Sequence, residues 1–190
     1  MSSVDKLEAA YAAKARSELA DADAVGGAGP DSWDGPVVGA RIAFLVAHRA
    51  DPAPAAILPD RTAEAVARAA EALGAADATF VLVTRPEAET SADARARRVR
   101  IALEAVDAPA VIALDSEAAE DLASAFELDR LRAGTPVRAM GRSLAFVGEF
   151  TASLDDASAK AKAWSAMKAA AAQAGIADKR QPRAPRNAQT

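Results

Sequence analysis

Five polar or charged residues that could take part in chemistry follow the apolar segments of the chain. They are His48, Asp51, Arg85, Glu149 and Thr151. A histidine at such a place could act as a general base or hydrogen-bond to a nucleobase, although an exposed loop histidine without a role is the simpler interpretation. Glu149 could pair with Arg85 or His48. Convergence of Asp51, His48, Arg85 and Glu149 within hydrogen-bond reach of one pocket would favour chemistry, and their dispersal would favour a scaffold.

Several common kinds of active site are excluded by composition. The chain has no cysteine and a single histidine, so disulfides, thiol nucleophiles and cysteine-ligated metals are impossible and a zinc site is not expected. The glycine-rich stretch GGAG at 26–29 precedes the first apolar segment instead of following it, and no phosphate-binding loop or G-x-S-x-G motif is present. We therefore predict no catalytic residue of a standard motif, no metal and no cofactor.

The charge distribution bears on the kind of partner. The formal net charge is −4, while the C-terminal tail is basic, with Lys179, Arg180, Arg183 and Arg186 against Asp178. The rest of the chain is therefore more acidic than the whole, which disfavours tight binding of nucleic acid by the folded part. The four basic residues could still add nonspecific electrostatic contact with nucleic acid.

The elements that would position the five residues are four apolar runs separated by amphipathic helices. The runs are 41–46, 79–84, 110–114 and 143–147. Such continuous apolar runs are typical of buried parallel strands. The alternation predicts an α/β fold, a three-layer α/β/α sandwich with a mostly parallel four-stranded sheet. A ligand site is then expected beyond the carboxyl ends of the strands.

Further patterns complete the predicted organisation. Residues 4–25 predict a helix that lies on the body, 26–36 predict a loop, and a hairpin is expected to turn at Gly141–Arg142. A helix from residue 92 to 106 is expected to point four arginines outward. The domain division is 1–36, an N-terminal helix and Gly/Pro-rich loop; 37–176, the α/β domain; and 177–190, a disordered basic tail.

No segment predicts a membrane span or a signal peptide, because no apolar run approaches the roughly 18 residues that a span requires. We therefore expect a cytoplasmic protein.

Four stretches resemble the uracil-DNA glycosylase superfamily in order and spacing. GARIAFLVAHRAD, at 39–51, resembles its first strand and water-activating loop, and the segment 63–85 resembles its next helix and strand. The segment 92–126 resembles a helix followed by the pattern R-P-x-V-V-V-A-L-G-x-x-A-A-x-x-L. The segment 141–169 is similar to the strand that ends in H-P-S-x-x-L and to the closing helix. The likeness covers roughly residues 40–174.

The departures from the family pattern fall on its active residues. Ala47 or His48 stands at the water-activating position, Arg85 replaces the base-reading asparagine, and Glu149–Phe150–Thr151 replaces histidine–proline–serine. The cysteines of the iron–sulfur branch are also absent. A glycosylase must activate water and support a leaving uracil anion, which a glutamate would repel.

The resemblance therefore implies a catalytically degenerate relative, a binding or interaction module with a weak DNA or protein partner. Two alternatives stay open. One is an active DNA glycosylase, an N-glycosidic hydrolase with a site rebuilt on His48 and Asp51. The other is an α/β scaffold or small-ligand binder with a convergent fold.

Overall fold

A mixed six-stranded sheet forms the centre of the protein. The computed structural model describes residues 2–26, 32–48, 57–86 and 90–176. Four central strands run parallel in the order β3, β2, β4 and β6. Their bounds are Thr79–Val83, Ile42–Val46, Ala110–Ala113 and Arg142–Phe146. The α/β prediction is confirmed and these four strands lie where the apolar runs placed them.

The predicted number of strands was wrong, because a short antiparallel strand extends the sheet at each edge. β1 (Trp33–Asp34) pairs with β3, and β5 (Val137–Ala139) pairs with β6. β1 lies inside the segment that was predicted to be a loop, where the Trp33 ring stacks on Phe80 with 5.8 Å between ring centroids. A two-residue strand has no periodicity, so nothing in the sequence could distinguish it from a loop.

The hairpin between β5 and β6 is present, but it turns one residue earlier than predicted. Ala139 pairs with Arg142, which makes Met140 and Gly141 the two loop residues. Both have positive φ, 47° and 81°, as the type I′ turn of a two-residue hairpin requires.

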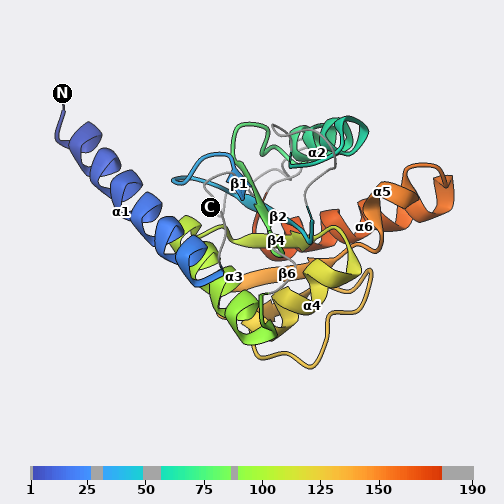
Figure 1. Cartoon of the computed structure of the whole chain (residues 1–190). Coiled ribbons are helices and arrows are strands. Elements are labelled where there is room, and N and C mark those ends of the chain that lie inside the picture. The colour runs from blue at the N-terminus through green and yellow to red at the C-terminus, as the bar shows by residue number, and fades with distance from the viewer. Residues whose placement is uncertain (1, 27–31, 49–56, 87–89, 177–190) are drawn as a thin grey trace, which may run out of the picture.

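Helices cover both faces of the sheet (Figure 1). On one face the core is formed with α1, α3 and α4, and on the other with α2, α5 and α6. The bounds are Ser3–Gly26 for α1, Asp60–Ala72 for α2, Ala92–Val106 for α3, Ser116–Ala125 for α4, Phe150–Ser153 for α5 and Ala157–Gln173 for α6. In β2, Ala43 and Leu45 face the first of these cores, while Ile42 and Phe44 face the second. Both faces of a central strand are thus buried, which explains its continuous apolar run.

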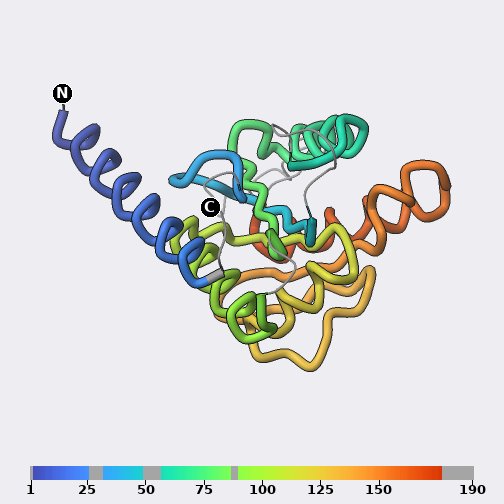
Figure 2. Tube along the Cα trace, in the orientation of Figure 1, coloured from blue at the N-terminus to red at the C-terminus, as the bar shows by residue number. Residues whose placement is uncertain are grey.

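Helix α1 is only half attached to the body. Its C-terminal half buries Leu19 and Ala22, and the helix packs on α3. The N-terminal half, coloured blue, projects beyond the body (Figure 2), and there Val4, Leu7 and Tyr11 are more than half exposed. Among the described residues, no helix combines the length and apolar character needed to cross a membrane.

One of the four arginines of α3 contradicts the prediction that all of them point outward. Arg98 is fully buried, and its guanidinium donates to Asp23 of α1 at 3.0 Å and to the Ser32 hydroxyl at 2.7 Å. It also donates to the carbonyl of Val83. Burial lowers the pKa of Arg98, and the bond to Asp23 opposes that shift. The buried pair joins α1 to α3 and to the end of β3.

The connections define where a ligand site would lie. From β2 the chain crosses to its neighbour β3, toward one edge of the sheet. From β4 it crosses to its neighbour β6, toward the opposite edge. The topological switch point is therefore between β2 and β4. In open α/β sheets ligands bind in the crevice outside the carboxyl ends of the strands at this point.

Candidate functional site

Asp115 joins the ends of the two strands at the switch point. One of its carboxylate oxygens accepts from the Ala47 amide, just past β2, at 2.9 Å. The other accepts from the Ala118 amide at 2.7 Å and caps the N-terminus of α4. Burial raises the pKa of Asp115, and the charges of Glu149 and Glu117 add to the rise, while the two amide bonds oppose it. The side chain therefore acts as a fixed connector between β2 and α4.

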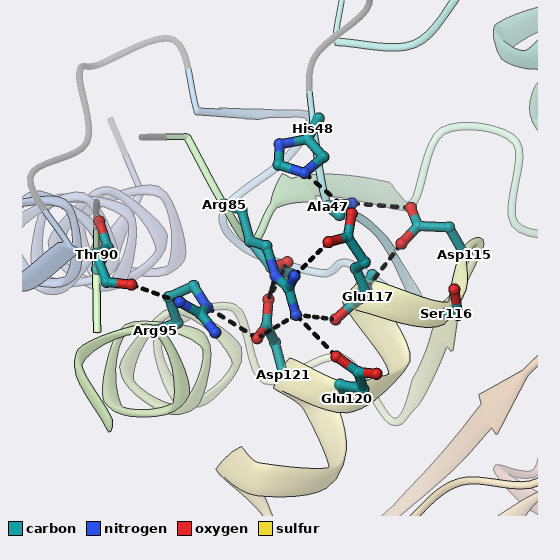
Figure 3. A network of polar contacts seen from close by, with 12 residues as sticks. Ala47, His48, Arg85, Thr90, Arg95, Asp115, Ser116, Glu117, Glu120 and Asp121 are labelled. Atoms are coloured by element: carbon teal, nitrogen blue, oxygen red, sulfur yellow. Dashed lines mark hydrogen bonds and ion pairs between the residues drawn. The ribbon is translucent and has the colours of Figure 1, made fainter. Parts of the chain in front are cut away.

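His48 and Arg85 both contact Glu117, in the first turn of α4 (Figure 3). Nε2 of His48 lies 3.0 Å from one carboxylate oxygen of Glu117, and the His48 side chain is 56% exposed. The guanidinium of Arg85 donates to the other oxygen of the same carboxylate. The structure thus brings these two predicted residues together through a third residue that the sequence analysis did not select.

Arg85 is surrounded by acceptors on α4. Its Nε donates to Asp121 at 2.9 Å, and its Nη2 donates to Glu120 at 3.1 Å and to the carbonyl of Glu117 at 3.2 Å. The side chain is only 15% exposed. The hydrogen bond to Asp121 raises the pKa of Arg85 above its ordinary value, against the effect of burial. This guanidinium is therefore permanently charged, and each of its three nitrogens donates to an acceptor of α4.

Asp121 is the centre of the network. Its side chain is 4% exposed and accepts from the Thr84 hydroxyl at 2.7 Å, from Arg85, and from Nε of Arg95 in α3 at 3.0 Å. Burial raises the pKa of Asp121, but the hydrogen bonds from Arg85, Thr84 and Arg95 outweigh it, so the pKa lies below its usual value. This carboxylate connects the end of β3 to α3 and α4.

The other predicted residues separate from this network. Glu149, which follows β6, accepts a hydrogen bond from the amide of Ser116, the residue after Asp115, at 3.0 Å. The Thr151 hydroxyl bonds instead to the Thr62 hydroxyl of α2 at 3.0 Å, so Thr151 does not join the strand-end residues. Asp51 and the four basic tail residues lie outside the described residues.

The residues that sequence reasoning missed are the acids of α4. Glu117, Glu120 and Asp121 have the i, i+3, i+4 spacing that places side chains on one helix face, directly after the end of β4. That spacing was a usable signal. Exposed acids in the first turns of a helix are nevertheless common, because their negative charge interacts favourably with the positive N-terminal end of the helix dipole.

The assembled site is acidic. Five carboxylates lie at the strand ends against the two guanidinium groups of Arg85 and Arg95; they belong to Asp115, Glu117, Glu120, Asp121 and Glu149. Such a field disfavours a phosphate backbone. Despite the number of acids, no group of three or more His, Asp or Glu side chains in the described part of the chain is arranged to hold a metal ion.

A groove of about 1010 Å³ begins at Glu149 and extends along α6. Its lining is dominated by small residues such as Ala152, Ser158 and Ala161, with Glu149 and Lys162 as its charged groups. It therefore offers shape and a few polar contacts.

Comparison with known proteins finds no protein-family model and no curated protein that matches this sequence.

Proposed function

We propose that this chain is a non-catalytic binding or interaction module, a divergent relative of the uracil-DNA glycosylases that keeps their framework without their hydrolytic chemistry. The observation that carries the proposal is that the strand-end groups form hydrogen bonds and ion pairs with neighbouring residues of the protein. Arg85 donates hydrogen bonds to three acidic residues of α4, and His48 is hydrogen-bonded to one of them, Glu117. Glu149 accepts a hydrogen bond from the Ser116 amide.

The resemblance aligns Arg85 with a base-reading residue and Glu149 with a donor that supports the leaving uracil. A base-reading group needs free donors and acceptors for the flipped base, but the guanidinium of Arg85 is occupied by carboxylates. A carboxylate at the second position repels a developing anion. Loss of one positioned donor costs about 10²–10³-fold in rate, and loss of general-base assistance costs around 10²–10⁴-fold. Even with overlapping effects, little acceleration should remain.

The acidic strand ends favour a protein partner over a nucleic acid. A glycosylase must hold the phosphates on both sides of the flipped nucleotide, and five carboxylates at the mouth of the site oppose that contact. The groove beside Glu149 offers a surface of small residues that a peptide segment could enter.

The proposal is tested by uracil excision with the full chain in excess over labelled single- and double-stranded oligonucleotides at low salt, scored as abasic sites. We expect no excision above that of the protein-free reaction. Excision that rises with protein concentration would contradict the proposal, and its disappearance in His48→Ala or Asp51→Asn would assign the rebuilt site.

DNA binding gives a second test of the electrostatic argument. Glu120→Lys removes an acid at the strand ends and should strengthen the binding of a labelled oligonucleotide, measured by anisotropy over a salt series. Glu71→Lys makes the same charge change in the last turns of α2, and it should have a smaller effect. Equal effects of the two substitutions would mean that the strand ends do not specifically exclude DNA.

A further inference from the structure

A second, smaller pocket lies between α2, α5 and α6, and it shares no residue with the strand-end network. Its volume is about 210 Å³. Four large apolar side chains line it, namely Phe150, Leu154, Trp164 and Met167. Phe150, Leu154 and Met167 are buried members of the core on this face of the sheet, and Trp164 packs against them while remaining partly exposed. The pocket is therefore an apolar recess that opens directly from the core.

The recess exists because α2 contributes three alanines to its lining, with Arg68 as the one larger side chain of that helix. Ala65, Ala69 and Ala72 follow one another at the spacing of a single helix face, opposite the large side chains of α5 and α6. Methyl groups leave a space that larger residues would fill. The ammonium of Lys168 lies 5.7 Å from the centre of the Trp164 ring, which is within the range of a cation–π contact. This contact stabilises the indole at the pocket.

Two cations stand at the rim. Arg68 of α2 is paired with Glu64 on its own helix, so its charge is largely compensated. The side chain of Lys160 is exposed, and among the described residues no carboxylate pairs with its ammonium. An apolar recess therefore lies beside an uncompensated positive charge. This combination complements a ligand with an apolar body and one acidic group.

The volume limits the ligand to a single ring with a short substituent. A cavity of about 150 Å³ lined by apolar side chains is sufficient for benzene. The pocket described above is larger by roughly the volume that a carboxylate and a linking carbon occupy. We propose that this pocket binds a small aromatic carboxylate of the benzoate or phenylacetate class, with the ring against Trp164 and Met167 and the carboxylate beside Lys160. The proposal is independent of the function suggested above for the strand ends.

The test uses phenylacetate as the ligand and the full chain carrying Trp33→Phe. The chain has two tryptophans, so Trp164 becomes its only indole. A titration followed by tryptophan fluorescence, with calorimetry as a label-free check, should give saturable binding in roughly the millimolar range expected for ten non-hydrogen atoms. Absence of saturation up to about ten times that range would overturn the proposal.

Two substitutions separate the contributions of shape and charge. Ala69→Leu should fill the recess and abolish binding of phenylacetate and of its neutral analogue phenylacetamide, while the thermal midpoint confirms that the protein is folded. Lys160→Met should weaken the binding of phenylacetate roughly twofold to fivefold, as expected for one exposed ion pair, and leave the binding of phenylacetamide unchanged.

Lys162→Met is the matched control, because Lys162 is on the same helix but faces the larger groove. It should not change either affinity. Binding that survives Ala69→Leu would place the ligand elsewhere and overturn the proposal. An equal loss in the two lysine variants would overturn the role of Lys160.

Discussion

The most informative single substitution in the strand-end network is Asp121→Ala. This carboxylate is the acceptor on which Thr84, Arg85 and Arg95 converge, and it is almost completely buried. Its removal leaves the Thr84 hydroxyl, in a residue with no exposed surface, without its acceptor. It also deprives the mostly buried Arg85 of its principal partner. The perturbation therefore breaks a buried network instead of a surface ion pair.

The expected loss of stability follows from burial. Removal of one partner from a buried ion pair costs about 3–5 kcal/mol. The value here should lie near the lower limit, about 3 kcal/mol, because Arg85 retains Glu117 and Glu120 as acceptors. For a protein near this size, that loss lowers the thermal midpoint by roughly 6–12 °C.

The dependence on pH gives an independent check of the same reasoning. Burial alone would raise the pKa of Asp121, but the bonds from Arg85, Thr84 and Arg95 hold it below the ordinary value of 3.8. A carboxyl group whose folded-state pKa is lowered contributes stability above the unfolded-state pKa and loses it as the pH falls through the folded-state pKa. The difference in free energy of unfolding between the native protein and Asp121→Ala should therefore be constant near neutral pH and shrink below about pH 4.

The assay is denaturant unfolding at neutral pH and over an acidic pH series. Glu120→Ala is the matched control, because Glu120 also accepts from Arg85 but its side chain is 73% exposed. Its removal should change the free energy of unfolding by less than about 0.5 kcal/mol. Equal effects of the two substitutions, or an Asp121→Ala difference that does not vary with pH, would refute the assignment of Asp121 as the centre of the network.

Three further predictions concern stability. Leu19→Ala should lower the free energy of unfolding by about 2–5 kcal/mol, because Leu19 is buried. Leu7→Ala, on the projecting half of α1, should change it by less than about 0.5 kcal/mol. Equal losses in denaturant unfolding would contradict the observed attachment of α1. Gly35→Ala should lower the thermal midpoint of the protein more than Gly39→Ala does. Both glycines have positive φ, but only at Gly35 would a Cβ lie 2.3 Å from a carbonyl oxygen of β3. The thermal midpoints of the two variants test this. Deletion of 177–190 should move the thermal midpoint by no more than a degree or two, and a drop above about 4 °C would mean that the tail packs on the domain.

The central strands and the start of α3 could be predicted because their signals are local. A strand buried on both faces must be apolar at every position, as Ile42–Val46 is. A helix N-cap needs one acceptor side chain at a fixed offset, and Ser91 supplies it directly before α3, the helix that was predicted from residue 92. The edge strand β1 lacked such a signal, since it has two residues and depends on pairing with the distant β3.

Arg98 illustrates why local patterns mislead for buried charges. A helix pattern assigns an arginine to the solvent face because desolvation of an unpaired guanidinium is costly. Here Asp23 and Ser32, distant in sequence, supply the charge and the acceptor that make burial possible. Only tertiary packing brings these residues together, so no short window of the sequence contains the information.

The candidate site shows the same division between local and tertiary information, and this bears on function. Sheet topology was sufficient to place His48, Arg85 and Glu149 beyond the carboxyl ends of the strands. Their partners on α4, however, depend on the rotation of that helix about its axis relative to the strands. A general base must keep an accessible lone pair and a pKa near the working pH. Asp115 has both oxygens committed to backbone amides, and Asp121 is held ionised by three donors. The same contacts that rigidify the strand ends therefore remove the carboxylates of Asp115 and Asp121 from proton transfer.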